Sequence, residues 1–182
     1  MRIILVTGGA RGGKSRYAQE RAWALGGSAV TFIATADASD DEMARRIERH
    51  RAARPSDWAT IEAPRDAGRA VLAAETDVVL LDCLNVLAAN ALTGRDAARS
   101  EIDALAAIDA EIDGLLSAAA SRDGLLIVVS NEVGFGVHPP TALGRWFRDG
   151  LGIANQRVAT IADEVVLMVA GVPLHVKHGR AP

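Results

Sequence analysis

The sequence is poor in the features that secreted, membrane-spanning and nucleic-acid-binding proteins use. One cysteine, Cys83, allows no disulfide within the chain, and we expect a cytoplasmic protein. Every long apolar run is broken within about ten residues, whereas a bilayer needs roughly 20, so no membrane span is predicted. The 20 Lys and Arg residues are outnumbered by 23 Asp and Glu residues, and a net charge of −3 provides no footprint for nucleic acid. Small anions are better candidate ligands than polymers.

Lysine is also scarce, and its position is informative. Only Lys14 and Lys177 are lysines, because arginine supplies nearly all the positive charge. Lys14 belongs to the stretch Gly8–Ser15, GGARGGKS, which fits the phosphate-binding pattern G-x-x-x-x-G-K-[ST]. The apolar run Arg2–Thr7 before it predicts a buried strand, and Arg16–Leu25 after it predicts a helix. Strand, glycine loop and helix follow in the order that a P-loop requires.

The residue types of this loop suit triphosphate chemistry. Glycine permits the positive φ that lets successive N–H groups point at one phosphate, and four glycines are placed for it: Gly8, Gly9, Gly12 and Gly13. Ala10 and Arg11 complete the loop, and the N-terminus of the next helix faces the anion. Lys14 is predicted to contact the β- and γ-phosphates, and Ser15 to bind Mg²⁺. A chance match in a glycine-rich loop is the alternative.

The remaining pattern predicts a single α/β domain, residues 1–182, with the fold of a P-loop NTPase. Apolar strands alternate with helices, which favours a mostly parallel sheet with helices on both faces. The last two strands are joined by too few residues for a crossover, so they form a C-terminal antiparallel hairpin. The predicted strands are Arg2–Thr7, Ala29–Ala34, Trp58–Glu62, Asp77–Asp82, Leu125–Val129, Glu164–Ala170 and Pro173–Lys177. The predicted helices are Arg16–Leu25, Ser39–Arg54, Arg65–Ala74, Leu84–Leu92, Asp96–Ser121 and Pro140–Ala162, and the core stripe of the fifth is Ile102, Leu105, Ile108, Ile112, Leu115 and Leu116.

Polar residues follow three of the predicted strands, at the sheet edge where open α/β sheets bind ligands. Asp82 ends an apolar strand in the Walker-B arrangement and is predicted to hold Mg²⁺, directly or through water. The loop Thr35 to Asp37, with Ala36 between them, either lines the site or merely connects two elements. Asn131 and Glu132 either orient a water or substrate hydroxyl or reflect simple turn chemistry.

The helix predicted from Ser39 carries an unusual histidine. Arg46 and Arg54 lie four residues to either side of His50 and therefore share its helix face. Their positive charge disfavours the imidazolium, and the neutral ring is the form that can act as a nucleophile. The alternative is an arginine-rich, solvated helix that carries an incidental histidine. Spacing alone does not decide between the two.

Four segments of the chain resemble one family closely. They are GGARGGKS at Gly8, DDEMARRIERHRAARPSDW from Asp40 to Trp58, SNEVGFG from Ser130 and ANQRVATIADEV from Ala154. In these segments the chain is similar to the bifunctional adenosylcobinamide kinase and adenosylcobinamide-phosphate guanylyltransferase of cobalamin biosynthesis. The resemblance covers nearly the full length. Its most specific part is R-I-x-x-H-x-x-x-R-P-x-x-W, from Arg46 to Trp58.

The resemblance implies two reactions. In the first, ATP or GTP phosphorylates the aminopropanol hydroxyl of adenosylcobinamide; in the second, GMP passes from GTP through a guanylylated His50 to adenosylcobinamide phosphate, giving adenosyl-GDP-cobinamide. It also implies a homotrimer with nucleotide sites near subunit boundaries. The GTP contacts that it implies are Gly8 to Ser15, Thr35, Ala36, Asp37, Ala53, Arg54, Pro55, Ser56, Glu62 and Asp82.

Two positions depart from the family pattern without removing a required group. Gly12 stands where the family more often has Ser, and Asp82 stands where some members have Glu. One alternative function is an ordinary small-molecule kinase in which His50 is structural. A regulatory GTPase is a second alternative, but the chain has no Asn-Lys pair and so lacks the N-K-x-D motif that reads guanine.

Overall fold

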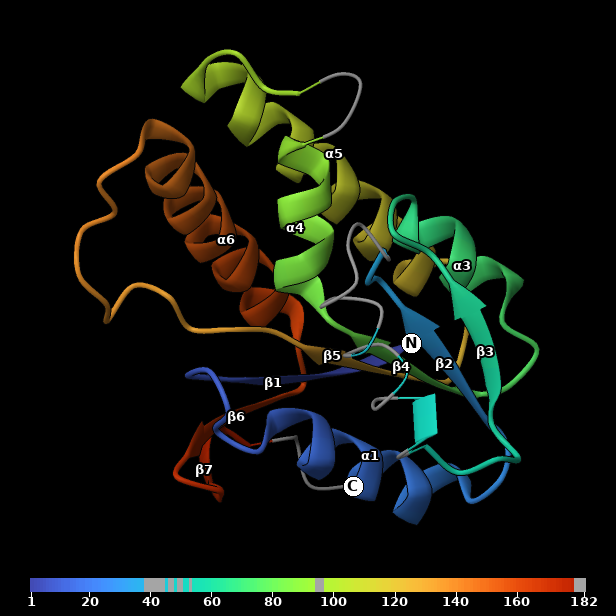
Figure 1. Ribbon diagram of the computed structural model, residues 1–182. Helices are drawn as coiled ribbons and strands as arrows, with labels where there is room; N and C mark the ends of the chain where they lie inside the picture. Colours follow the sequence, from blue (N-terminus) through green and yellow to red (C-terminus); the bar gives the residue numbers. More distant parts are fainter. Residues whose placement is uncertain (38–44, 46–47, 49–50, 53, 94–96, 179–182) are drawn as a thin grey trace.

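A computed structural model shows one seven-stranded sheet with helices on both faces (Figure 1). It describes residues 1–37, 45, 48, 51–52, 54–93 and 97–178. The strand order is β3-β2-β4-β5-β1-β6-β7, and all neighbours are parallel except β6 and β7. The predicted α/β fold class, with its antiparallel C-terminal hairpin, is confirmed. The strands are β1 (Arg2–Gly8), β2 (Val30–Ala34), β3 (Ala59–Glu62), β4 (Val78–Asp82), β5 (Leu125–Val129), β6 (Glu164–Val169) and β7 (Val172–Lys177).

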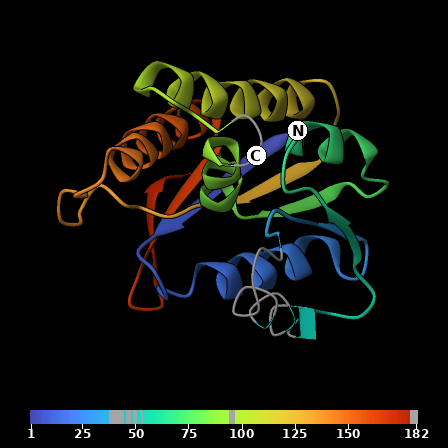
Figure 2. The same cartoon turned by 45° about the horizontal axis from the view of Figure 1, so that its top comes forward.

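The helices form two unequal layers. Helix α1 covers one face of the sheet, and the helices labelled α3 to α6 cover the opposite face (Figures 1 and 2). The helix bounds are α1 (Lys14–Gly26), α3 (Ala67–Ala73), α4 (Leu84–Leu92), α5 (Glu101–Ala120) and α6 (Ala142–Ile161). None of the described helices combines the length and apolar character needed to span a bilayer.

Alternate residues of each central strand enter two separate cores, because successive side chains of a strand point to opposite faces. On β1, Ile4 and Val6 join the core beneath α1, whereas Ile3 and Leu5 join the larger core beneath α3 to α6. The central strands are buried on both faces, which explains why they are continuously apolar in sequence. Polar side chains therefore gather at the strand ends.

Helices α5 and α6 begin later than predicted, because hydroxyl caps fix their starts. The Ser100 side chain accepts a hydrogen bond from the Asp103 amide at 3.1 Å, and α5 begins at Glu101 instead of near residue 96. The Thr141 hydroxyl likewise accepts from the Gly144 amide at 3.1 Å, so α6 begins at Ala142. Each cap satisfies an N–H group that the helix leaves unpaired.

One residue of the predicted core stripe of α5 is exposed. Ile102 is 80% exposed, whereas Ile108, Ile112 and Leu115 are fully buried. The buried face of α5 begins at Ala104, and two residues of helix rotate a side chain by about 200°. Ile102 therefore points to solvent, and the prediction that it joins the core is wrong.

The contact between α3 and α5 depends on one glycine. A Cβ added at Gly68 of α3 would lie 2.3 Å from the carbonyl oxygen of Gly114 on α5, whereas a Cβ added at Gly114 would meet nothing within 4 Å. We expect Gly68→Ala to lower the free energy of unfolding by about 1–3 kcal/mol, because backbone must move to admit the methyl group. Gly114→Ala is the matched control and should be neutral or stabilising by up to about 1 kcal/mol. Urea unfolding of both variants tests this, and equal effects would contradict it.

Candidate functional site

The P-loop turns tightly between β1 and α1, as predicted, and Lys14 is the first residue of the helix. Its ammonium donates to the Gly9 carbonyl oxygen at 2.7 Å, and its side chain is buried. Positive φ occurs at Gly8 and Gly13, and also at Arg11, but not at Gly9 or Gly12. The prediction that all four glycines use positive φ is therefore wrong for two of them. Ala10 completes the turn, and Ser15 lies in the first turn of α1, beside Lys14.

The β6–β7 hairpin packs against the backbone of the P-loop. A Cβ added at Gly8 would lie 2.5 Å from the Met168 carbonyl oxygen. The Gly171 amide donates to the Gly12 carbonyl oxygen at 3.2 Å, so the hairpin turn is bonded directly to the loop. Sequence reasoning missed this support, since no local signal links a C-terminal turn to an N-terminal loop.

Asp82 lies at the same sheet edge as the P-loop. It ends β4, and β5 separates β4 from β1, so the segment after β5 begins between Asp82 and the loop. The Ser15 hydroxyl and the Asp82 carboxylate are hard oxygen donors that suit Mg²⁺, a cation that keeps several waters and takes few protein ligands. Among the described residues, no cluster of three or more His, Cys, Asp or Glu side chains could hold a metal. The donor set present fits Mg²⁺ bound mainly through a nucleotide.

Thr35 serves the framework of the site. It is fully buried, and its hydroxyl donates to the Cys83 carbonyl oxygen and accepts from the Cys83 amide, both at 2.8 Å. The Asn90 side-chain amide of α4 donates to the Thr35 and Pro64 carbonyl oxygens at 2.8 and 2.9 Å. These bonds join the ends of β2, β3 and β4. Sequence reasoning missed Asn90, although a polar residue within an apolar helix was a visible signal.

The remaining residues of the β2 loop are more accessible. Ala36 is half-buried, and Asp37 is exposed. Glu62 ends β3, beside the end of β2, and forms a 3.0 Å ion pair with Arg51. All three lie at the sheet edge predicted for the nucleotide.

Arg54 reaches the site from the segment after the arginine-rich stretch. Its guanidinium carbon lies 3.6 Å from the centre of the Phe32 ring, a cation–π contact. Burial lowers the pKa of Arg54 from its usual value, and the nearby Asp82 carboxylate opposes that shift. Pro55 is half-buried and Ser56 is exposed, and of this short segment Arg54 is the residue that lies near Asp82.

Trp58 anchors that segment to the α1 side of the sheet. Its side chain is buried, its indole N–H donates to the Gly27 carbonyl oxygen at 2.9 Å, and its ring stacks on Trp23 at 6.4 Å between centroids. The tryptophan of the R-P-x-x-W pattern thus has a structural role that fixes Arg54. His50, Arg46 and Ala53 lie outside the described residues, as do Ser39 and most of the helix predicted from it.

A cavity of about 520 Å³ opens beside the P-loop, beneath α6. Thr7 of β1, Glu132 after β5, and one face of α6 line it. The Glu132 amide donates to the Gly8 carbonyl oxygen at 3.1 Å, which confirms that the Asn131–Glu132 turn lies at this edge. A larger cavity of about 830 Å³ lies between α3 and α5, and none of the predicted site residues lines it.

Comparisons with known proteins point to one family. Residues 4–176 match the family model described as cobinamide kinase / cobinamide phosphate guanyltransferase. The bifunctional adenosylcobalamin biosynthesis protein CobU of Salmonella typhimurium is 42% identical over 184 residues, covering 96% of this chain and 99% of that protein. The bifunctional protein CobP of Pseudomonas aeruginosa is 42% identical over 176 residues, covering 95% and 96%.

Two solved structures share the fold at low sequence identity. One is an ATPase domain with a TM-score of 0.54 at 13% identity, covering 100% of this chain and 78% of that one. The flagellar accessory protein FlaH of Methanocaldococcus jannaschii has a TM-score of 0.50 at 17% identity, covering 100% and 80%.

Proposed function

We infer what the chain does from the premise that it belongs to the cobinamide kinase / cobinamide phosphate guanyltransferase family. It is a bifunctional enzyme that phosphorylates adenosylcobinamide with ATP or GTP. It then transfers GMP from GTP to adenosylcobinamide phosphate, and the product is adenosyl-GDP-cobinamide. We place both steps in the cytoplasm, in keeping with the single cysteine.

The P-loop carries the kinase step. Lys14 and the amide groups of Gly8 to Ser15 hold the β- and γ-phosphates, and Mg²⁺ bound by Ser15 and Asp82 supplies positive charge there. The supporting observation is the short bond from Lys14 to Gly9, which places the buried ammonium over the loop. An incoming phosphate offers a stronger, charged acceptor for the same proton.

The guanylyl step needs a second group, because GMP transfer requires attack at the α-phosphorus whereas the kinase step requires attack at the γ-phosphorus. We assign this attack to His50. Arg54, fixed near Asp82 by Trp58 and Phe32, supplies charge to the pentacoordinate phosphorus that forms. Thr35, Ala36, Asp37, Ala53, Pro55, Ser56 and Glu62 complete the proposed GTP contacts.

The two activities are tested together by incubating the protein with adenosylcobinamide, Mg²⁺ and GTP and separating the corrinoid products. We expect adenosylcobinamide phosphate first and adenosyl-GDP-cobinamide later. If the phosphate accumulates without the GDP derivative, the chain is a small-molecule kinase without guanylyl transfer. If neither product forms, the proposed function is wrong.

We also propose that the chain forms a homotrimer, on the resemblance and on the surface of β7. This edge strand exposes Val172, Leu174 and Val176, each by more than half of its surface, and they share one strand face. A long apolar edge strand is a site for association with another chain.

Leu174→Glu should convert the trimer to monomers. Association would bury the new carboxylate among the apolar side chains of β7, and burying a charge without a partner of opposite charge is costly. Light scattering at micromolar concentration measures the change in mass. Ile102→Glu, at an exposed apolar residue on α5, is the matched control and should leave the trimer intact. A wild-type protein of monomer mass would contradict the proposal.

A further inference from the structure

The cavity beneath α6 is separate from the residues proposed to hold nucleotide. Its floor is formed by Leu5 and Val165, and its wall is one face of α6 that includes Asn155 and Gln156. Thr7, which lines the cavity, directly precedes the P-loop, so the cavity lies next to the start of the loop, on the face of the sheet opposite α1. A substrate that attacks a phosphate held by the loop can approach from this side.

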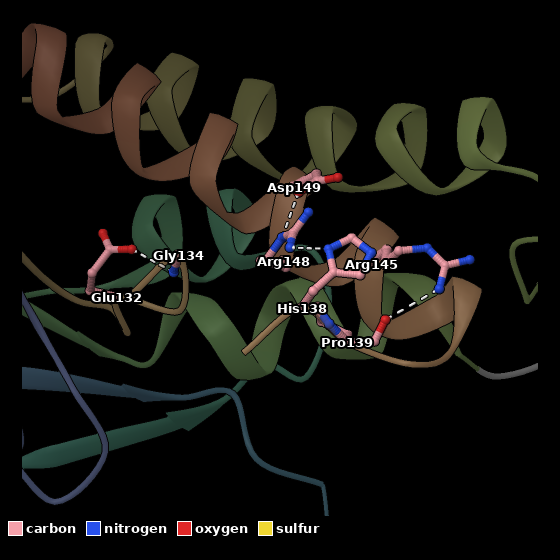
Figure 3. Close-up of polar contacts among 7 residues, drawn as sticks. All are labelled: Glu132, Gly134, His138, Pro139, Arg145, Arg148 and Asp149. Atoms are coloured by element: carbon pink, nitrogen blue, oxygen red, sulfur yellow. Dashed lines mark hydrogen bonds and ion pairs between the residues drawn. The ribbon is translucent and has the colours of Figure 1, made fainter. Parts of the chain in front are cut away.

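Glu132 lines this cavity, and one of its carboxylate oxygens accepts a hydrogen bond. Its Oε1 accepts from the Gly134 amide at 2.7 Å, as Figure 3 shows. Its backbone amide is bonded to Gly8, so the residue is fixed to the P-loop itself. In the part of the chain that the structure describes, Oε2 has no hydrogen-bond partner. The carboxylate can therefore accept a proton without first breaking a contact.

Thr7 adds an unsatisfied polar atom to the same cavity. Its Oγ1 is buried and has no hydrogen-bond partner among the described residues. Burying such a hydroxyl lowers the stability of the fold unless a ligand or a water molecule forms a hydrogen bond with it. Thr7 belongs to β1 and Glu132 follows the adjacent strand β5, and both line this one cavity.

The loop that carries Glu132 is hydrogen-bonded to side chains of α6. The Arg148 guanidinium contacts Nδ1 of His138 at 2.9 Å and donates to Asp149 at 2.8 Å (Figure 3). Arg145 donates to the carbonyl oxygens of Pro139 and Pro140 at 3.2 and 3.1 Å. The loop is therefore held by hydrogen bonds at both ends, at Glu132 beside the P-loop and at His138 to Pro140 beside α6.

We propose that this cavity binds the hydroxyl-bearing side arm of the acceptor, and that Glu132 is the general base of the kinase step. The proposal rests on the proposed function. The acceptor hydroxyl donates to Glu132 Oε2, and Thr7 Oγ1 donates to the acceptor oxygen. As that oxygen forms a bond to the γ-phosphorus, the bond from this phosphorus to the β,γ-bridging oxygen breaks. The proton moves to Glu132, and the nucleoside diphosphate leaves with the electron pair.

The two reactions place different demands on Glu132. An alcohol must lose its proton to become a phosphate ester, so the kinase step benefits from a base by roughly 10²–10⁴-fold. The phosphate of the second acceptor is already ionised and needs no base. A role in general-base catalysis therefore predicts a defect in one step only, whereas a damaged P-loop impairs both.

Glu132→Gln tests this, because the amide oxygen can still accept from Gly134 while the base is lost. We expect kinase turnover to fall by at least about 100-fold, with GMP labelling of the protein and transfer to adenosylcobinamide phosphate within about threefold of wild type. Glu132→Asp should restore part of the kinase activity. A Gln variant that keeps kinase turnover within threefold, or that loses both steps equally, would overturn the assignment.

Thr7→Val tests the cavity itself, because it keeps the shape of the side chain and removes its hydroxyl. We expect KM for adenosylcobinamide to rise about tenfold, as for one lost hydrogen bond, while KM for GTP stays within twofold. An unchanged KM for the acceptor, or an equal rise for GTP, would show that the acceptor binds elsewhere. Wild-type protein that forms neither corrinoid product would instead refute the proposed function.

Discussion

Lys14→Ala should lower kinase turnover by at least about 100-fold, the loss expected when one preorganised charge-stabilising donor is removed. The transferring γ-phosphoryl group loses its cation. The chain contains only one other lysine, Lys177, and its ammonium is bonded to the Ala159 and Thr160 carbonyl oxygens at the end of α6, both at 3.1 Å. No second lysine can replace Lys14.

Steady-state turnover of adenosylcobinamide at saturating nucleotide measures this loss. Lys177→Ala is the matched control: it removes the other ammonium, and turnover should stay within about threefold. Circular dichroism of both variants shows whether the fold is kept. Turnover of the Lys14 variant within a few-fold of wild type would refute the P-loop assignment.

His50→Ala should abolish guanylyl transfer altogether while leaving a large part of the kinase activity. The physical reason is that His50 is proposed to attack the α-phosphorus, whereas γ-transfer uses Lys14, Ser15 and Asp82. GTP labelled at the α-phosphate should leave label on the wild-type protein, and γ-labelled GTP should not. The adduct should be labile in acid and stable in alkali, as a phosphoramidate is.

The chain offers matched controls for this labelling, because it has only four histidines. His178→Ala removes a histidine that stacks on His175 beyond β7 and should label like wild type. Mass spectrometry of the intact protein measures the added GMP. A His50 variant that still forms the adduct, or that loses both activities while remaining folded, would show that another residue carries GMP.

Strand–loop–helix order, helical spacing and strand-end acids were enough to predict most of the fold. The apolar runs in the sequence became strands β1, β2, β4 and β5, which are buried on both faces. Such continuous apolar runs are typical of central strands in a parallel sheet covered by helices. Helix starts were less predictable, because Ser100 and Thr141 act through single hydrogen bonds that apolar spacing does not reveal.

The positions of the candidate site residues were predictable where one motif fixes them and unpredictable where distant segments meet. Lys14 and Asp82 follow from local patterns. The Asn90 bonds to Thr35 and Pro64, and the cavity shared by Thr7 and Glu132, depend on which strands become neighbours. Reading the four loop glycines as equivalent failed for the same reason. Glycine is required at position 8 partly because a Cβ there would collide with the Met168 carbonyl oxygen. That requirement comes from packing against β6 and not from phosphate binding.

That contact between the P-loop and the β6–β7 hairpin also bears on the order in which the protein can be made. The loop is synthesised first, near residue 8, but the backbone it rests on comes from residues 168 and 171. Bringing residues 168 and 171 next to the loop closes a long stretch of chain, which costs conformational entropy. The loop lacks these contacts until that closure has occurred. During synthesis, a nascent chain that already contains every residue of its phosphate motif still lacks the surface that gives the motif its shape. We therefore expect the loop to reach its described shape late, when the β6–β7 hairpin docks.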